Sequence, residues 1–387
     1  MNICFINMPI EFYSAASGGA ISTIMMQVAK ELIELGHHVT VLTKKNADAC
    51  YDVGDVIEIT APDKTELTIF QRIKCKIFRD LEGWDYPYYG VYLDSFTAAL
   101  QQLRIKPDVV MVFNDLVSPY FIKRVLPKTK VGVWFQNEQI TRFKKLHQSI
   151  QSTDRYLTCS NYIRDRAIAT HHLPTEKVVT AASGVDTTVF YPRDDSSAPK
   201  NGNQVKAVYV GRIDPNKGPD IAVRAVRKIT SESKCSVPFT IAGDVWFYAS
   251  ADVEKNAYRQ RLVDELETLD QKIFLGHVSH AKIAEIYREN DVAFVLSRTN
   301  EPFGLVSLEA MASGCAVIAS NRGGLPEACG TAGILVNPDN QEEVDTALRR
   351  LCKDRDWLSA QRKLSLERAA QATWRETARV FVESFTE

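Results

Sequence analysis

One stretch, residues 297–319, constrains the fold of this chain more than any other. It follows an apolar run over residues 292–296, whose length is typical of a buried strand. A loop with Pro302 and Gly304 comes next, then apolar residues at helical spacing, and then a second apolar strand over residues 316–319. The order strand, helix, strand predicts a parallel α/β sheet, and such sheets bind ligands beyond the carboxyl ends of their strands.

The helix in this stretch offers a place for an anion. The first amides of a helix have no partner within it and the helix dipole adds positive charge there, so a phosphate fits at Gly304, Leu305 and Val306. Glu301 precedes the helix and Glu309 lies about one turn inside it, and carboxylates accept hydrogen bonds from hydroxyl groups. A surface position explains either acid alone, but the pair around a Pro-Phe-Gly sequence favours a hydroxyl-rich phosphate ligand.

A second candidate phosphate site follows the strand predicted over residues 205–210. The loop after this strand, residues 211–218, contains Arg212 and Lys217. Two cations on a glycine-containing loop at the end of a parallel strand suit a diphosphate. The alternative is a pair of surface cations.

The N-terminal half predicts another α/β unit. A strand over residues 3–6, a helix over residues 20–35 and a strand over residues 39–42 form a strand–helix–strand crossover. Two glycines, Gly18 and Gly19, precede this helix. The dinucleotide-binding pattern G-x-G-x-x-G is absent, which disfavours a dehydrogenase. A plain loop-to-helix turn would also explain the paired glycines.

Polar residues follow a further strand, predicted over residues 131–135. They are Gln136, Asn137 and Glu138, and they come at the strand end where α/β proteins bind ligands. The amide of Gln136 can bind a hydroxyl or carbonyl group but cannot act as a base near neutral pH. Glu138 is the nearest ionisable residue and a candidate contact with a second substrate.

Length and composition limit the remaining possibilities. The 387 residues, 45% hydrophobic and 25% charged, predict two globular domains, and a net charge of −1 argues against a nucleic-acid binder. The eight cysteines lack metal-binding spacing, so we expect reduced thiols and no metal site. No apolar run is long enough to cross a membrane, and we expect a cytoplasmic protein.

Two short segments are candidates for contact with an acidic lipid surface or an acceptor. Residues 71–79 are basic and apolar in a helical pattern, and residues 84–89 are rich in aromatic side chains. Cations at residues 142–145 add to the first group. A solvated helix face with loop aromatics is the simpler alternative. The expected location therefore includes peripheral contact at the inner face of the membrane.

The stretch from Glu301 onward resembles the donor-sugar motif of retaining glycosyltransferases of family 4. The shared features are two glutamates with seven residues between them, Pro-Phe-Gly after the first, and a glycine before the next strand. The resemblance implies a GT-B fold, with two Rossmann-like doubly wound domains facing a cleft. The implied parts are an acceptor-side domain at 1–190, a linker at 191–204, a donor-binding domain at 205–365 and a C-terminal helix at 366–387 that crosses back to the first domain.

The resemblance also implies a reaction. A sugar would pass from a nucleotide diphosphate, with UDP favoured, to a hydroxyl of a glycan, glycolipid or small molecule, with retention and without a metal or other cofactor. Synthesis of a cell-surface polysaccharide or lipopolysaccharide is the expected pathway. A sugar-nucleotide epimerase or a phosphorylase of the same architecture, or a binding protein without turnover, are the alternatives; no motif supplies the pyridoxal-phosphate lysine of a phosphorylase.

Individual roles follow from the same resemblance. Catalytic roles are implied for Arg212, Lys217 and Glu301. Many relatives carry a histidine at the place of Gln136, so a role that needs a titrating side chain there is in doubt. The implied donor-binding residues are Gly18, Gly19, Val278, Phe303, Gly304, Leu305, Val306 and Glu309.

Overall fold

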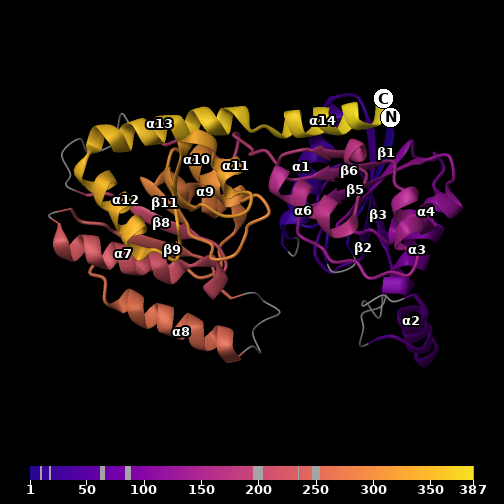
Figure 1. Ribbon diagram of the computed structural model, residues 1–387, viewed down its shortest axis with the longest axis horizontal. Helices are drawn as coiled ribbons and strands as arrows, with labels where there is room; N and C mark the ends of the chain where they lie inside the picture. Colours follow the sequence, from indigo (N-terminus) through magenta and orange to yellow (C-terminus); the bar gives the residue numbers. More distant parts are fainter. Residues whose placement is uncertain are drawn as a thin grey trace. The chain divides into compact units, whose positions relative to one another are not determined.

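The computed structural model divides the chain into two compact units (Figure 1). Unit 1 comprises Met1–Ser183 and Trp374–Glu387, and unit 2 comprises Gly184–Thr373. The amide of Val185 donates to the carbonyl of Ala372 at 2.9 Å, so unit 2 begins and ends at one place. The expected boundaries at residues 190 and 365 lie within unit 2. The structure describes residues 1–8, 11–16, 19–61, 66–82, 89–194, 204–233, 235–245 and 253–386.

A seven-stranded sheet forms the centre of unit 1. Each neighbouring pair of strands is parallel, as predicted for the N-terminal half. The order of strands reverses between β1 and β4, which are neighbours in the sheet. In spatial order the strands are β3 (Asp55–Ile59), β2 (His38–Lys44), β1 (Asn2–Ile6), β4 (Val109–Phe113), β5 (Lys130–Phe135), β6 (Arg155–Thr158) and β7 (Val178–Thr180).

Helices from both ends of the chain pack on this sheet. The last helix returns to unit 1, and there the Phe381 ring meets the ring of Phe5 edge-on at 5.7 Å and lies 6.1 Å from that of Trp134. Burial of these aromatic side chains attaches the C-terminal helix to the sheet. The helices are α1 (Ala20–Glu34), α2 (Ile69–Glu82), α3 (Tyr89–Gln102), α4 (Ser118–Val125), α5 (Leu146–Gln151), α6 (Asn161–His171) and α14 (Trp374–Thr386), with a 3-10 turn at Thr175–Lys177.

Unit 2 has a six-stranded parallel sheet of the same kind. Its order reverses between β8 and β11. Every residue of β11 is buried, because helices cover both faces of such a sheet. In spatial order the strands are β10 (Lys272–Phe274), β9 (Phe239–Ala242), β8 (Ala207–Val210), β11 (Val292–Val295), β12 (Ala316–Ser320) and β13 (Gly333–Val336).

The predicted strand–loop–helix–strand stretch is confirmed as β11, α10 and β12 of unit 2. Its helix α10 begins at Leu305 with Gly304 as its N-cap. The other helices are α7 (Pro219–Glu232), α8 (Val253–Glu267), α9 (His280–Arg288), α10 (Leu305–Ala312), α11 (Leu325–Cys329), α12 (Gln341–Lys353) and α13 (Arg355–Gln371), with 3-10 turns at Pro215–Lys217 and Gly330–Ala332.

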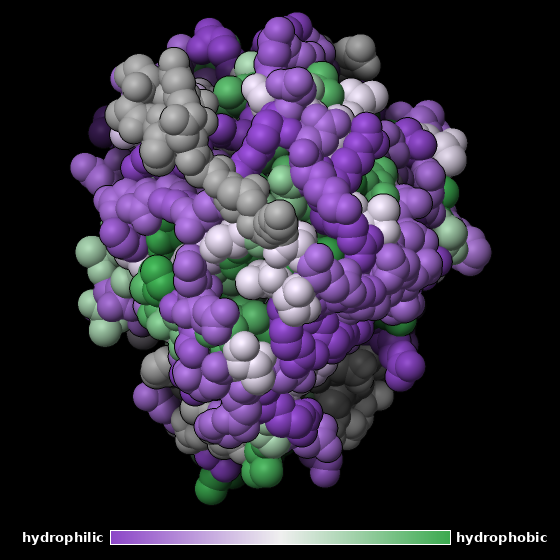
Figure 2. Space-filling model, turned by 90° about the vertical axis from the view of Figure 1, so that its left-hand side faces the viewer, coloured by the Kyte–Doolittle hydropathy of each residue, from purple (hydrophilic) through white to green (hydrophobic). Residues whose placement is uncertain are grey.

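The surface seen in Figure 2 is mainly hydrophilic, with hydrophobic residues interspersed among polar ones. Such scattered apolar residues are normal on a protein surface. None of the described helices combines the length and apolar character needed to cross a bilayer. Most of the linker predicted at 191–204, and most of the aromatic run at 84–89, lie outside the described residues.

Truncation of Phe381 tests the attachment of α14 to unit 1. Its side chain is completely buried. We expect Phe381→Ala to lower the free energy of unfolding by about 3–5 kcal/mol, because a large cavity replaces the ring. Urea denaturation measures the change, and Ile33→Ala on the exposed face of α1 is the control, expected within about 1 kcal/mol of the parent. Equal effects of the two substitutions would show that α14 is not part of the core of unit 1.

Candidate functional site

The carboxyl ends of β8 and β11 meet where the strand order of unit 2 reverses. The loop after β8 carries Arg212 and Lys217, and the loop after β11 carries Glu301. Nζ of Lys217 lies 2.5 Å from Oε1 of Glu301, and the hydroxyl of Ser297 donates to the same oxygen. The structure thus joins two of the three predicted catalytic residues directly, at the position where open α/β sheets bind ligands.

Glycines bring the backbone close to the Glu301 loop. Gly323 has φ of 59°, and a Cβ built on it would lie 2.3 Å from the carbonyl oxygen of Glu301. The amide of the following residue, Gly324, donates to that same carbonyl at 2.7 Å. Gly304 has φ of 108°, and a Cβ there would lie 2.4 Å from Cδ2 of Leu325. Residues with side chains would therefore move both the loop and the start of α10.

Arg298 ties the two loops of the site together. Its guanidinium donates to both carboxylate oxygens of Asp220 on α7, at 2.8 and 2.6 Å, and its amide donates to the carbonyl of Asn216 at 2.7 Å. The Tyr258 hydroxyl also donates to Asp220, at 2.6 Å. Burial raises the pKa of the Asp220 carboxyl, but the hydrogen bonds from Arg298 and Tyr258 and the nearby positive charges outweigh it and hold the pKa at about 2.

The backbone of Arg212 is fixed by a buried tyrosine. The hydroxyl of Tyr209, 2% exposed, donates to the carbonyl of Arg212 at 2.7 Å. Burial raises the pKa of Tyr209 well above its ordinary value, so this hydroxyl keeps its proton and remains a donor. No local pattern in the sequence singled out Tyr209, Asp220 or Arg298. Asp220 and Arg298 meet across the two loops, 78 residues apart, and Tyr209 reads as an ordinary buried strand residue.

Glu309, the second glutamate of the motif, pairs with a histidine from α9. Nε2 of His280 lies 3.2 Å from Oε1 of Glu309, and the His280 ring meets the ring of Phe190 edge-on at 5.1 Å. The hydrogen bond to Glu309 raises the pKa of His280, and the charges of Glu309 and Asp186 act in the same direction against a smaller effect of burial. His280 thus stabilises the position of the Glu309 carboxylate.

The remaining predicted residues of unit 2 differ in exposure. Leu305 and Val306 form the first turn of α10, where the amides of a helix lack internal partners. The ring of Phe303 is only 4% exposed and lies within the unit. Val278 is half-buried in the segment between β10 and α9. In the described ranges, no three His, Cys, Asp or Glu side chains come together as ligands for a metal.

In unit 1 a carboxylate lies at the start of α1. Gly19 is the N-cap of α1, and a Cβ built on it would lie 2.8 Å from Oε1 of Glu11. The amide and hydroxyl of Ser22 donate to Oε2 of Glu11 at 3.3 and 3.4 Å. Burial raises the pKa of Glu11, and these hydrogen bonds partly oppose the increase. No local pattern in the sequence singled out Glu11, and Gly18 lies outside the described residues.

An asparagine holds the turn that follows β5. Asn114 has φ of 49°, and its side-chain oxygen accepts from the amides of Gln136 and Asn137 at 2.7 and 3.2 Å. The Gln136 side chain is 5% exposed, and its Nε2 has no hydrogen-bond partner within the described part of the chain. A buried amide nitrogen without a partner is uncommon, and Nε2 of Gln136 therefore remains available as a hydrogen-bond donor.

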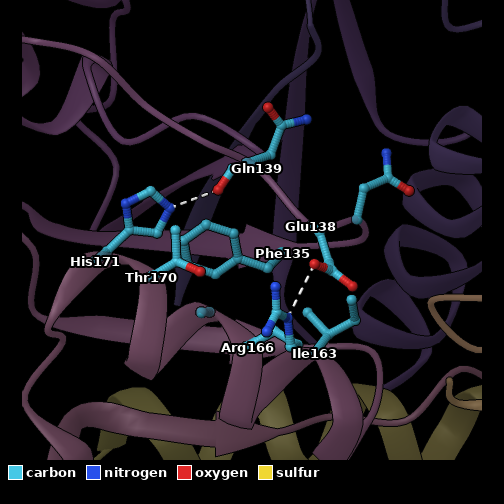
Figure 3. Close-up of a pocket in the computed structure, with 9 residues that line it drawn as sticks. Phe135, Glu138, Gln139, Ile163, Arg166, Thr170 and His171 are labelled. Atoms are coloured by element: carbon cyan, nitrogen blue, oxygen red, sulfur yellow. Dashed lines mark hydrogen bonds and ion pairs between the residues drawn. The ribbon is translucent and has the colours of Figure 1, made fainter. Parts of the chain in front are cut away.

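Glu138 lines a small pocket between this turn and α6 (Figure 3). Its carboxylate accepts from Nε of Arg166 at 3.0 Å and from the hydroxyl of Tyr162. On the other side Nε2 of His171 lies 2.8 Å from the carbonyl of Gln139. The cavity of about 10 Å³ has room for one water molecule and not for a sugar.

The pH dependence of stability tests the His280–Glu309 contact. Because the pKa of His280 is raised in the folded state, the contact stabilises the protein below the unfolded-state pKa, and this stabilisation disappears as pH rises through the folded-state pKa. The ordinary pKa of histidine is about 6.5. We therefore expect His280→Asn to lower the melting temperature more at pH 5.5 than at pH 8.5, and we expect this difference to be smaller in a Glu309→Gln background, where the charge of Asp186 still acts on His280. An equal loss at both pH values would contradict this account.

Comparison with known proteins covers nearly the whole chain. The family described as Glycosyltransferase Family 4 matches residues 18–189, and the family described as Glycosyl transferases group 1 matches residues 191–371. The meeting point of the two matches lies close to the boundary between the structural units at residues 183 and 184.

Curated relatives carry glycosyltransferase and spore-coat names. D-inositol 3-phosphate glycosyltransferase of Stackebrandtia nassauensis is 30% identical over 62% of this chain and 56% of its own length. The protein of that name from Thermobispora bispora is 29% identical over 98% and 92%. Spore coat protein SA of Bacillus subtilis is 30% identical over 70% and 76%. The chain spans just over half the length of several of the D-inositol 3-phosphate glycosyltransferases that it matches.

Solved structures with the same fold cover the entire chain. Sucrose-phosphate synthase from Thermosynechococcus elongatus has a TM-score of 0.73 at 20% identity and covers 99% of this chain and 98% of its own. The Anabaena protein HepE, in complex with UDP-glucose, has a TM-score of 0.72 at 16% identity and covers 100% and 99%. At these identities the likeness shows the fold alone, which is two Rossmann-like α/β units.

Proposed function

Because the chain belongs to glycosyltransferase family 4, we propose that it transfers a sugar from a nucleoside diphosphate sugar, most simply a UDP-sugar, to a hydroxyl group with retention at the anomeric carbon. The observation that carries this proposal is the contact of Lys217 with Glu301 at the reversal point of the unit 2 sheet. The carboxylate that holds this cation lies on the loop that leads into α10, and the first amides of a helix have no partner within it, so one loop and the helix start after it carry groups for a diphosphate and for sugar hydroxyls.

The proposed reaction is a displacement on one face of the sugar. The bond between the anomeric carbon and the diphosphate oxygen breaks, a bond to the acceptor oxygen forms, and the acceptor proton moves to an oxygen of the departing phosphate. The anomeric carbon becomes oxocarbenium-like as the bond breaks. Because the departing phosphate takes the acceptor proton, the reaction needs no protein base. This agrees with the buried amide of Gln136, which stands in place of a titrating side chain.

Residues of unit 2 would stabilise the charge that develops. Arg212 and Lys217, with the first amides of α10, would hold the leaving diphosphate, where fixed donors act more strongly than water does. Glu301 would orient the sugar, and Glu309 would accept from ribose hydroxyls. The pairs Lys217–Glu301 and Glu309–His280 would keep these groups in place before the donor arrives, because neither partner has to be ordered during binding.

The proposed acceptor class rests on the names of relatives and on the family. The names of several relatives favour a phosphorylated polyol, and a glycan or lipid-linked acceptor in cell-surface polysaccharide synthesis also fits the family. An epimerase would convert the nucleotide sugar without an acceptor, and a binding protein would leave it unchanged. Analysis of products formed with and without an acceptor separates these three activities.

Substitution of the cations tests the proposed reaction. We expect Arg212→Ala and Lys217→Ala each to lower kcat by about 10²–10³-fold, because each removes a group that stabilises the leaving diphosphate. Turnover of a UDP-sugar with the acceptor that gives product would be measured at saturating donor. Lys363→Ala, an exposed lysine on α13, is the matched control and should retain the parent rate.

Parent-like kcat in both Arg212→Ala and Lys217→Ala would reject the assigned roles. Product formation without any acceptor, with release of a new nucleotide sugar, would reject transfer in favour of epimerisation. Binding of a UDP-sugar without conversion in the presence of every acceptor class would reject the enzymatic proposal as a whole.

A further inference from the structure

One helix face in unit 1 exposes several large apolar side chains together. It belongs to α2, the helix that the basic and apolar pattern predicted over residues 71–79. At about 100° per residue the four side chains fall within an arc of about 100° over residues 69–77, and they form what we call the apolar stripe. Their exposed fractions are 74% for Ile69, 83% for Phe70, 50% for Ile73 and 50% for Ile77.

The apolar stripe points away from the body of unit 1. Cys75 lies on the opposite side of α2 and is only 4% exposed. α2 packs on the neighbouring helix α3, and Figure 1 shows it beyond the helices that cover the sheet of its unit. The stripe is therefore not part of the packing that holds α2 in the fold.

Lysines border the apolar stripe on both sides. Around the helix, Lys76 lies about 20° outside the edge marked by Ile69, and Lys74 lies about 40° outside the edge marked by Phe70. Both lysines are exposed, and Lys74 pairs with Asp94 on α3. An apolar face with cations on either side is the pattern of a helix that lies in a membrane interface, since the long stems of lysine carry their charges to the phosphate groups.

We propose that α2 binds the surface of a bilayer that contains anionic phospholipid. The apolar stripe enters the region between headgroups and acyl chains, and Lys74 and Lys76 lie beside lipid phosphates. The lysines at the borders of the apolar stripe favour an anionic bilayer over a second copy of the chain as its partner. A second copy of α2 against the stripe would bring lysine borders next to lysine borders, whereas an anionic surface attracts both. The proposal does not depend on the reaction that the protein catalyses.

Vesicle binding by the intact chain tests this proposal. The chain is sedimented with vesicles of phosphatidylcholine alone and with vesicles containing about one-third phosphatidylglycerol, an anionic lipid. We expect binding to the anionic vesicles, weaker binding to the neutral ones, and a bound fraction that falls as salt screens the lysines.

Substitutions in α2 separate the apolar and the electrostatic contributions to vesicle binding. Ile73→Ser with Ile77→Ser should weaken binding to anionic vesicles by about tenfold or more, because the favourable transfer of two apolar side chains from water into the bilayer is lost. Lys76→Gln should weaken it by about fivefold, and only on anionic vesicles. Ile105→Ser and Lys128→Gln are the matched controls, since both residues are exposed in unit 1 outside α2, and both should bind as the parent does. Circular dichroism confirms that each variant is folded.

Three results would overturn the proposal. The first is an intact chain that fails to bind anionic vesicles. The second is an equal loss of binding in Ile105→Ser and in the double isoleucine variant, which would deny any special role for α2. The third is self-association in analytical ultracentrifugation that the double variant abolishes, without vesicle binding, which would assign the apolar stripe to a second copy of the chain.

Discussion

The site of unit 2 depends on one ion pair across the point where the strand order reverses. Lys217 and Glu301 are 84 residues apart in sequence, and they meet because β8 and β11 are neighbours in the sheet. The Glu301 side chain is only 13% exposed, so its charge needs a partner, and removal of Lys217 would leave that charge with the neutral Ser297 hydroxyl in place of a cation. In the proposed reaction the donor diphosphate competes with Glu301 for Lys217, which would free the carboxylate for the sugar.

Other contacts keep this pair in place from several directions. Arg298 fixes the loop after β11 to Asp220 at the start of α7, and Gly323 lets the backbone of a later segment approach Glu301. On α10, the contact with His280 positions the carboxylate of Glu309, the second glutamate of the motif. Each support comes from a different element, so the geometry depends on the packed unit and not on the loop alone. Such support is what a preorganised site requires.

Local patterns in the sequence predicted the strands and the helix of the motif, but they did not predict the contacts that hold its side chains in place. The apolar runs and the glycine at residue 304 predicted β11, α10 and β12, because periodicity and backbone freedom are local properties. The pairs Arg298–Asp220 and His280–Glu309 join residues 78 and 29 positions apart. Which loops meet is decided by strand order, which a single sequence does not specify. The basic and apolar spacing of α2 predicted a helix, but only its packing on α3 showed which face is exposed.

The central claim is that Lys217 holds the diphosphate while Glu301 holds the sugar. Calorimetric titration of the Glu301→Gln variant with UDP and with a UDP-sugar tests it most directly. The account predicts that the variant binds UDP at least as tightly as the parent, because Lys217 is released from its partner, and that it loses the additional affinity that the sugar provides. A variant that loses affinity for UDP and for the UDP-sugar to the same extent would contradict the account.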